Sequence, residues 1–104
     1  MPTSSTLVDT LAAYRFAFDG IEYTTPKLGT VYNPMEYAWA PTARYLERFG
    51  EATPRRVLFL GMNPGPWGMA QTGVPFGDVV AVRDWMGIRE PVEQPSNEIE
   101  ARPI

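Results

Sequence analysis

The sequence predicts an α/β fold from three features that follow one another along the chain. Residues 57–60 are apolar at every position, which is typical of a strand covered on both faces. Residues 61–77 are rich in glycine and proline, which indicates a long loop. A helical spacing of apolar residues begins after Asp78. Strand, loop and helix in this order make one β-loop-α unit.

Two helices are predicted before the strand. Apolar side chains recur every three to four positions over residues 6–19, which predicts an amphipathic helix that ends at Gly20. Residues 20–40 are predicted to be irregular and are rich in aromatic side chains. A second helix is predicted from Pro41, a first-turn proline, to Gly50, which stops it.

The helix after the loop has clear start and stop signals. Asp78 is a typical N-cap, Val82 and Met86 continue the apolar face, and Gly87 ends the helix. A cap needs no further role, so we do not assign Asp78 as a general base. Residues 89–104 contain three prolines and no apolar periodicity, which predicts an acidic loop or linker.

Composition sets wider limits. The chain has 104 residues, enough for one small core, and a net charge of −3. Because the first 89 residues are neutral, the charge neither argues for nor excludes contact with nucleic acid. The chain has no Cys and no His, which excludes disulfides and thiolate metal sites. With no signal peptide and no apolar run near the ~20 residues of a membrane span, we expect a soluble intracellular protein.

A single strand cannot make a sheet. The backbone groups of a parallel strand normally pair with neighbours on both edges, and only residues 57–60 form a convincing strand. Either the sequence is partial, or the remaining strands come from another chain.

The loop stands where open α/β sheets bind ligands, beyond the carboxyl end of the strand. Its glycines permit close approach of the backbone, its prolines stiffen the path, and the helix after it directs free N–H groups to the same region. Such a loop suits a pocket that holds a flat polar ring beside a water molecule.

The loop also resembles a known motif. Residues 61–66 (Gly-Met-Asn-Pro-Gly-Pro) and 68–77 (Gly-Met-Ala-Gln-Thr-Gly-Val-Pro-Phe-Gly) closely resemble the first active-site motif of the single-strand-selective monofunctional uracil-DNA glycosylases. Residues 32–39 and 82–88 resemble the flanking segments of that family. Trp67 stands where the family would lead us to expect Phe.

The resemblance implies a fold and an activity. The fold is an α/β/α sandwich with a mostly parallel central sheet, of which residues 1–88 would be the N-terminal part and residues 89–104 a loop or linker. The activity is excision of uracil, including oxidised derivatives, from single- or double-stranded DNA, which initiates base-excision repair without cofactor or metal. A bacterial member would be cytoplasmic and a eukaryotic member nuclear.

The resemblance also assigns roles to four residues. Asn63 matches the asparagine that positions the attacking water, and Phe76 matches the ring that stacks on the flipped base. Met62 and Gly65 match positions that line the base pocket. Outside this context, Asn63 would more often be a turn residue and Phe76 a core residue.

Half of the family's site is missing from this sequence. The second motif contains a His that supports the departing uracil anion, and this chain has no His. A later base-recognising Asn is also absent, because Asn97 lies in the polar tail. We therefore expect an incomplete chain that is inactive alone and needs the remaining part of the glycosylase domain. The alternative is a non-catalytic fragment that binds a base or nucleotide. A phosphate-binding β-loop-α unit is weaker, since the loop lacks the usual Lys and Ser/Thr.

Other residues have simpler interpretations. Arg55 and Arg56 are candidates for phosphate contact, but an arginine pair before a strand is usually solvated. We interpret the aromatic residues of the N-terminal half mainly as packing of the helices over the sheet; they are Tyr32, Tyr37, Trp39, Tyr45 and Phe49. Of the methionines Met62, Met69 and Met86, only Met62 stands where the motif implies a pocket role.

Overall fold

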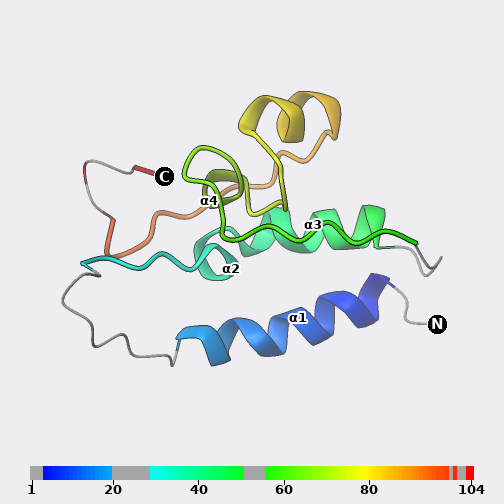
Figure 1. Cartoon of the computed structure of the whole chain (residues 1–104), viewed down its shortest axis with the longest axis horizontal. Helices are drawn as coiled ribbons and strands as arrows, with labels where there is room; N and C mark the ends of the chain where they lie inside the picture. The colour runs from blue at the N-terminus through cyan, green and yellow to red at the C-terminus, as the bar shows by residue number, and fades with distance from the viewer. Residues whose placement is uncertain (1–3, 20–28, 51–55, 99, 101–102) are drawn as a thin grey trace.

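The computed structural model describes residues 4–19, 29–50, 56–98, 100 and 103–104. Its elements are α1 (Ser4–Asp19), α2 (Pro34–Tyr37), α3 (Trp39–Phe49), α4 (Met69–Thr72) and a π-helical turn, η1 (Ala81–Trp85). Helix α1 packs against α3, and α2 contacts α1, α3 and α4 (Figure 1). Within these described ranges no residue is in a strand and no helix is long and apolar enough to cross a membrane.

The two predicted N-terminal helices are confirmed. Helix α1 covers the predicted residues 6–19 and starts two residues earlier, while Gly20 lies outside the described residues. Helix α3 starts two residues before Pro41 and ends at Gly50, whose N–H donates to the Leu46 carbonyl at 2.8 Å. Local capping and apolar spacing therefore determine both helices.

The prediction of an irregular segment over residues 20–40 is partly wrong. Residues 20–28 are not described, but α2 forms within the rest. The Asn33 side chain accepts a hydrogen bond from the Met35 N–H at 3.1 Å, and Pro34 follows as the first helical residue. Asn followed by Pro is a helix start as well as a turn signal, which is why the sequence pattern was ambiguous.

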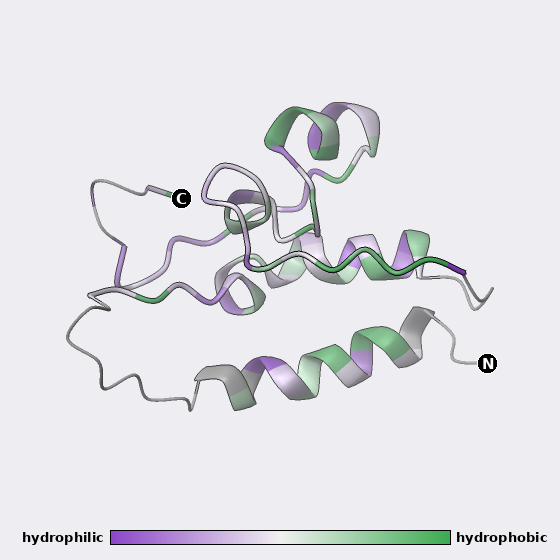
Figure 2. Ribbon diagram, in the orientation of Figure 1, coloured by the Kyte–Doolittle hydropathy of each residue, from purple (hydrophilic) through white to green (hydrophobic). Residues whose placement is uncertain are grey.

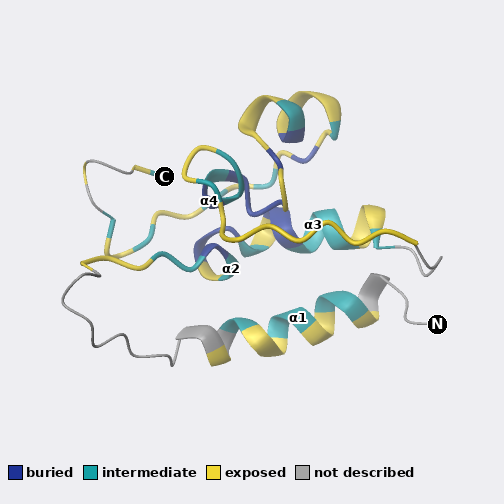
Figure 3. Cartoon of the chain, viewed as in Figure 1, coloured by how far each residue is buried: buried dark blue, intermediate teal, exposed yellow. Residues whose placement is uncertain are grey.

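The predicted strand does not form among the described residues. Residues 57–60 run without regular structure, and no backbone hydrogen bond of the described part involves them. Their side chains are 67–89% exposed, so an apolar segment lies on the surface (Figures 2 and 3). The reason is the constraint already noted: a strand needs a neighbouring strand to pair its N–H and C=O groups.

A small core lies beneath the loop. Val74, Val82 and Ile88 are buried, and Tyr45 and Met86 pack against them. This core joins the loop, the turn after it and helix α3. Further buried residues lie in α2, at the start of α3 and in α4 (Figure 3).

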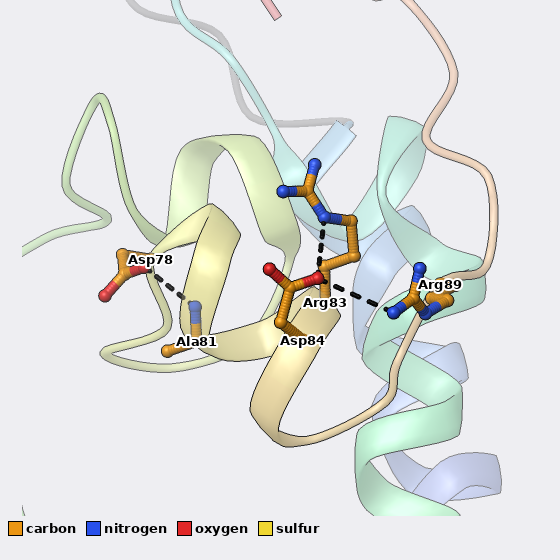
Figure 4. A network of polar contacts seen from close by, with 5 residues as sticks. All are labelled: Asp78, Ala81, Arg83, Asp84 and Arg89. Carbon is orange, nitrogen blue, oxygen red and sulfur yellow. Dashed lines mark hydrogen bonds and ion pairs between the residues drawn. The ribbon is translucent and has the colours of Figure 1, made fainter.

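The helix predicted after Asp78 is shorter and of a different type. Asp78 is confirmed as its cap, since Oδ1 accepts a hydrogen bond from the Ala81 N–H at 2.9 Å (Figure 4). The turn is π-helical, with the Met86 N–H donating to the Ala81 carbonyl at 2.9 Å, and Gly87 ends it at φ +69°. Asp84 pairs with Arg83 at 3.1 Å and with Arg89 at 3.5 Å on the exposed side, where such pairs contribute little.

Two buried hydroxyl groups join the helices to the loop. The Tyr37 hydroxyl donates to the Ala70 carbonyl in α4. The Thr42 hydroxyl lies 2.9 Å from the Ala38 carbonyl and 2.8 Å from that of Gly73. Gly73 has φ +72°, and a Cβ there would lie 2.5 Å from Thr42 Oγ1, so only glycine fits without displacement.

The described residues of the tail contain no helix or strand, and they are held to the N-terminal half. The Glu93 N–H donates to the Tyr37 carbonyl at 2.8 Å, and Asn97 Nδ2 donates to the Val31 carbonyl at 2.8 Å. Asn97 is therefore a structural residue in a loop without helix or strand.

We predict that Tyr37→Phe lowers the free energy of unfolding by about 1–3 kcal/mol, because it leaves the Ala70 carbonyl without its donor.

Burial, reinforced by the neighbouring Tyr32, raises the pKa of Tyr37 from 10.0 to about 12. Above pH 10 the unfolded chain loses this proton first, so the stabilisation falls as the pH rises towards about 12. Urea unfolding at several pH values measures both effects.

The matched control is Tyr45→Phe, which removes a hydroxyl that makes no hydrogen bond in the described part of the structure. Tyr37→Phe should remove the part of the slope between pH 10 and about pH 12 that Tyr37 causes, and Tyr45→Phe should retain that part. An identical slope in both variants would contradict the assignment.

We predict that Gly73→Ala lowers the free energy of unfolding by about 2–3 kcal/mol, since the new Cβ meets Thr42 and the backbone is left-handed. Gly29→Ala is the control, because a Cβ there meets nothing within 4 Å. Equal stability of the two variants in urea would show that the close packing at Gly73 is not formed.

Candidate functional site

One cavity of about 740 Å³ lies at the loop, and the four residues assigned from sequence all line it. Met62, Asn63 and Gly65 come from the start of the loop, and Phe76 comes from its end. The size falls within the roughly 300–1,000 Å³ of small-ligand pockets. The loop thus folds back so that both ends of the motif face one space.

Aromatic rings form much of the wall. Phe59 and Trp67 line the cavity together with Phe76. The Phe59 and Phe76 rings meet edge to face, with centroids 6.4 Å apart at 75°. The Phe76 ring also lies against Gly61, where a Cβ would be 3.4 Å from two ring carbons. The wall therefore offers planar apolar surface to a flat ligand.

Phe76 has an unusual backbone. Its φ is +59°, and it is the one non-glycine residue with positive φ in the described part of the chain. A left-handed conformation costs an L-residue about 1–2 kcal/mol. Its side chain is nevertheless 72% exposed, so burial of the ring does not offset this conformational free energy. Strain of this kind is concentrated at ligand-binding sites.

Asn63 offers an amide to the same cavity. Its Nδ2 donates to the Pro64 carbonyl at 3.0 Å, which orients the side chain. Within the described part of the structure its Oδ1 accepts no hydrogen bond from the protein. An oriented amide oxygen that is exposed in a cavity can accept a hydrogen bond from a water molecule and hold it in place.

The loop contains a helical turn that sequence analysis missed. The Gly65 carbonyl accepts hydrogen bonds from the N–H groups of Gly68 at 3.2 Å and Ala70 at 3.0 Å, which starts α4. Gln71 Nε2 then donates to the Pro66 carbonyl at 3.1 Å and the Pro103 carbonyl at 2.7 Å. The many Gly and Pro residues led to the prediction of a loop without helix, whereas these longer-range hydrogen bonds stabilise a short one.

The charge of the cavity is low. Among the described residues that line it, only Asp78 is charged and none is basic. Arg56 is exposed elsewhere, and Arg55 lies outside the described residues. Such a lining favours a neutral ring over a phosphate group.

The helix after the loop contributes less than predicted. The Ala81 N–H is bound by the Asp78 carboxylate, so this donor is not free to meet a developing negative charge. Phe59 and Trp67 were not predicted to belong to the site. Phe59 looked like a strand residue buried on both faces, and the position of Trp67 inside the motif was the one signal available.

The sequence was compared with known proteins. No family model matches it. It is 58% identical over 77 residues to the single-strand selective monofunctional uracil DNA glycosylase of Bos taurus, covering 74% of this chain and 28% of that protein. The proteins of the same name from Mus musculus and Rattus norvegicus are each 56% identical over 77 residues, with 27% of each covered.

The chain thus spans little more than a quarter of the length of these curated relatives. An identity of 58% over 74% of its own residues is nevertheless specific. On this similarity, the chain belongs to the family of single-strand-selective monofunctional uracil-DNA glycosylases.

Proposed function

We propose that this chain supplies the base-stacking and water-positioning half of a site that excises uracil from DNA by hydrolysing the N-glycosidic bond. The observation that carries the proposal is that Met62, Asn63, Gly65 and Phe76 line the same cavity. Membership of a glycosylase family supports the same activity. The DNA partner and the uracil specificity are part of this proposal.

The chemistry follows from the groups in the cavity. A base extruded from the DNA stack lies on the exposed Phe76 ring, with Met62 and Gly65 beside it. The N-glycosidic bond breaks, its electron pair leaves with uracil, and the sugar becomes cation-like. A water held by the Asn63 amide oxygen then bonds to the sugar carbon and loses a proton to solvent. The uracil anion takes up a proton from solvent in turn, so the products are neutral uracil and an abasic sugar. Because the cation is a strong electrophile, the water needs placement more than deprotonation.

The departing uracil anion needs a second half of the site. The sequence has no His, and no basic side chain lines the described cavity. We place the anion-stabilising donors outside these residues, in the part of the domain that the longer relatives contain and this chain does not match.

The proposed fold is likewise completed by residues outside this chain. Residues 57–60 would become a central strand of an α/β/α sandwich once neighbouring strands pair with them, since their apolar side chains are exposed. Residues 1–88 would belong to that domain and residues 89–104 would connect it to the rest. All three relatives named above are mammalian, so we propose the nucleus as the location, and none of them supports a cytoplasmic one.

We predict that the isolated chain releases no uracil from a single-stranded uracil-containing oligonucleotide, because the anion-stabilising half is absent. A chimera that joins this chain to the unmatched segment of the bovine relative should release it. The readout is strand cleavage after alkaline treatment at the abasic site.

Hydrogen exchange distinguishes failure of folding from failure of chemistry. The amides of residues 57–60 should exchange fast in the isolated chain and slowly in the chimera, as pairing in a sheet requires. Uracil release by the isolated chain would overturn the division of the site. Fast exchange at residues 57–60 in an active chimera would overturn the strand assignment.

We predict that, in the chimera, Asn63→Ala lowers kcat about a hundredfold through loss of water placement. The control is Asn97→Ala, which removes the same side chain from the tail and should leave kcat unchanged. If both changes lowered kcat equally, Asn63 would have no specific role.

We predict that Phe76→Ala raises KM about tenfold, as expected when about 1–3 kcal/mol of base stacking is lost. Phe49→Ala removes an exposed ring outside the cavity and serves as the control. The non-catalytic base-binding function predicts a different result. The chimera would then bind uracil-containing DNA and excise nothing, and binding would depend on Phe76 but not on Asn63.

A further inference from the structure

Thr72 lies at the end of α4 and is almost completely buried, with 5% of its surface exposed. Its hydroxyl oxygen lies 2.8 Å from the Gly77 carbonyl and 3.3 Å from the Gly68 carbonyl. A hydroxyl has one proton to donate, and the shorter contact is the one to Gly77. The same oxygen accepts a hydrogen bond from the Val74 N–H at 3.1 Å.

These bonds close a circuit around the tip of the loop. The Val74 N–H donates to Thr72 Oγ1, Thr72 Oγ1 donates to the Gly77 carbonyl, and the Gly77 N–H donates to the Val74 carbonyl at 2.9 Å. Only Pro75 and Phe76 lie between Val74 and Gly77. The circuit therefore encloses the two residues that form the tip.

The enclosed turn, Val74 to Gly77, has features of a type II turn but lacks the glycine usual at its third position. Proline at the second position and positive φ at the third are typical of a type II turn, in which the third residue is usually glycine. Here the third residue is Phe76, with φ +59°. Such a conformation persists only where the surroundings hold it.

The base of the turn is also fixed by packing. A Cβ at Gly77 would lie 2.5 Å from Val82 Cγ2 and 3.0 Å from Val74 Cβ, so Gly77 rests directly on the core. Val74 itself is fully buried. Both ends of the turn are thus held in the core, and the Thr72 hydroxyl is hydrogen-bonded to each of them.

We propose that Thr72 is a positioning residue: its buried hydroxyl closes the turn that holds Phe76 in a left-handed conformation and directs its ring to the cavity. The catalytic consequence rests on the proposed function of Phe76. The conformational part stands on the circuit alone. Thr72 acts through Phe76, because it does not line the cavity that Phe76 faces.

Three variants separate the hydroxyl from general packing. Thr72→Val keeps the shape and removes the hydroxyl, whereas Thr72→Ser keeps the hydroxyl and removes a methyl group. Thr42→Val is the matched control, since Thr42 is an equally buried threonine that bonds to the carbonyls of Ala38 and Gly73 outside the circuit.

The first measurement is NMR of the chain itself, without substrate. The ¹³C shifts and the N–H to Hα coupling of Phe76 report the sign of its φ. We expect positive φ in the unaltered chain, Thr72→Ser and Thr42→Val, and its loss in Thr72→Val. Retention of positive φ in Thr72→Val, or its loss in Thr42→Val as well, would overturn the proposal.

A second measurement on the unaltered chain does not depend on whether a variant folds. The amides of Val74 and Gly77 belong to the circuit, while the Phe76 amide has no acceptor in the described part of the structure. Hydrogen exchange should therefore be slow at Val74 and Gly77 and fast at Phe76. Equal exchange at all three would show that the circuit is not formed.

The third measurement is uracil release by the chimera. Thr72→Val should raise KM about fivefold with little change in kcat, as for loss of a stacking contact, while Thr72→Ser should restore KM. If Thr72→Val lost the positive φ of Phe76 but left KM unchanged, the conformational role of Thr72 would stand. The proposed stacking function of Phe76 would then be wrong.

Discussion

The loop that carries the motif depends on buried hydroxyl groups, because buried backbone carbonyls must find a donor and the described part of the chain has no sheet to provide one. Tyr37 donates to the Ala70 carbonyl, Thr42 contacts that of Gly73 and Thr72 contacts that of Gly77. The first two donors come from the N-terminal helical segment and the third from α4. Helices that look remote from the chemistry therefore hold the wall of the cavity.

The sequence predicted elements whose signals are local. Apolar spacing and glycine stops were enough for α1 and α3, and Asp78 was found from its capping pattern alone. Helix α4 was missed, because distant partners, the Tyr37 hydroxyl and the Pro103 carbonyl, stabilise it. The π-helical form of η1 was also missed, since no local signal in the sequence distinguished it from an α-helix. Strand 57–60 was predicted from its apolar run, but pairing is a property of its neighbours and not of the segment.

The candidate site was predictable in its residues and not in its geometry. Motif resemblance named Asn63, Phe76, Met62 and Gly65, and these residues line one cavity. Nothing in the sequence pattern indicated that Phe76 would have a positive φ, since aromatic residues rarely do. The conformation arises from contacts of Thr72 and Gly77, which the motif contains but does not explain. The roles of the four residues remain a prediction.

The exposed apolar segment links the site to the rest of the proposed domain. Full burial of an apolar side chain of this size contributes about 1.5–3 kcal/mol, so full burial of the four exposed residues 57–60 would contribute about 6–12 kcal/mol. That amount is comparable to the whole stability of a typical domain. Successive strand residues face opposite sides, and Phe59 contacts Phe76. Pairing of the segment would therefore fix Phe59 on the loop side and tighten the wall on which a base is proposed to stack. Assembly of the sheet and organisation of the cavity would then be one event, because the same side chain belongs to both.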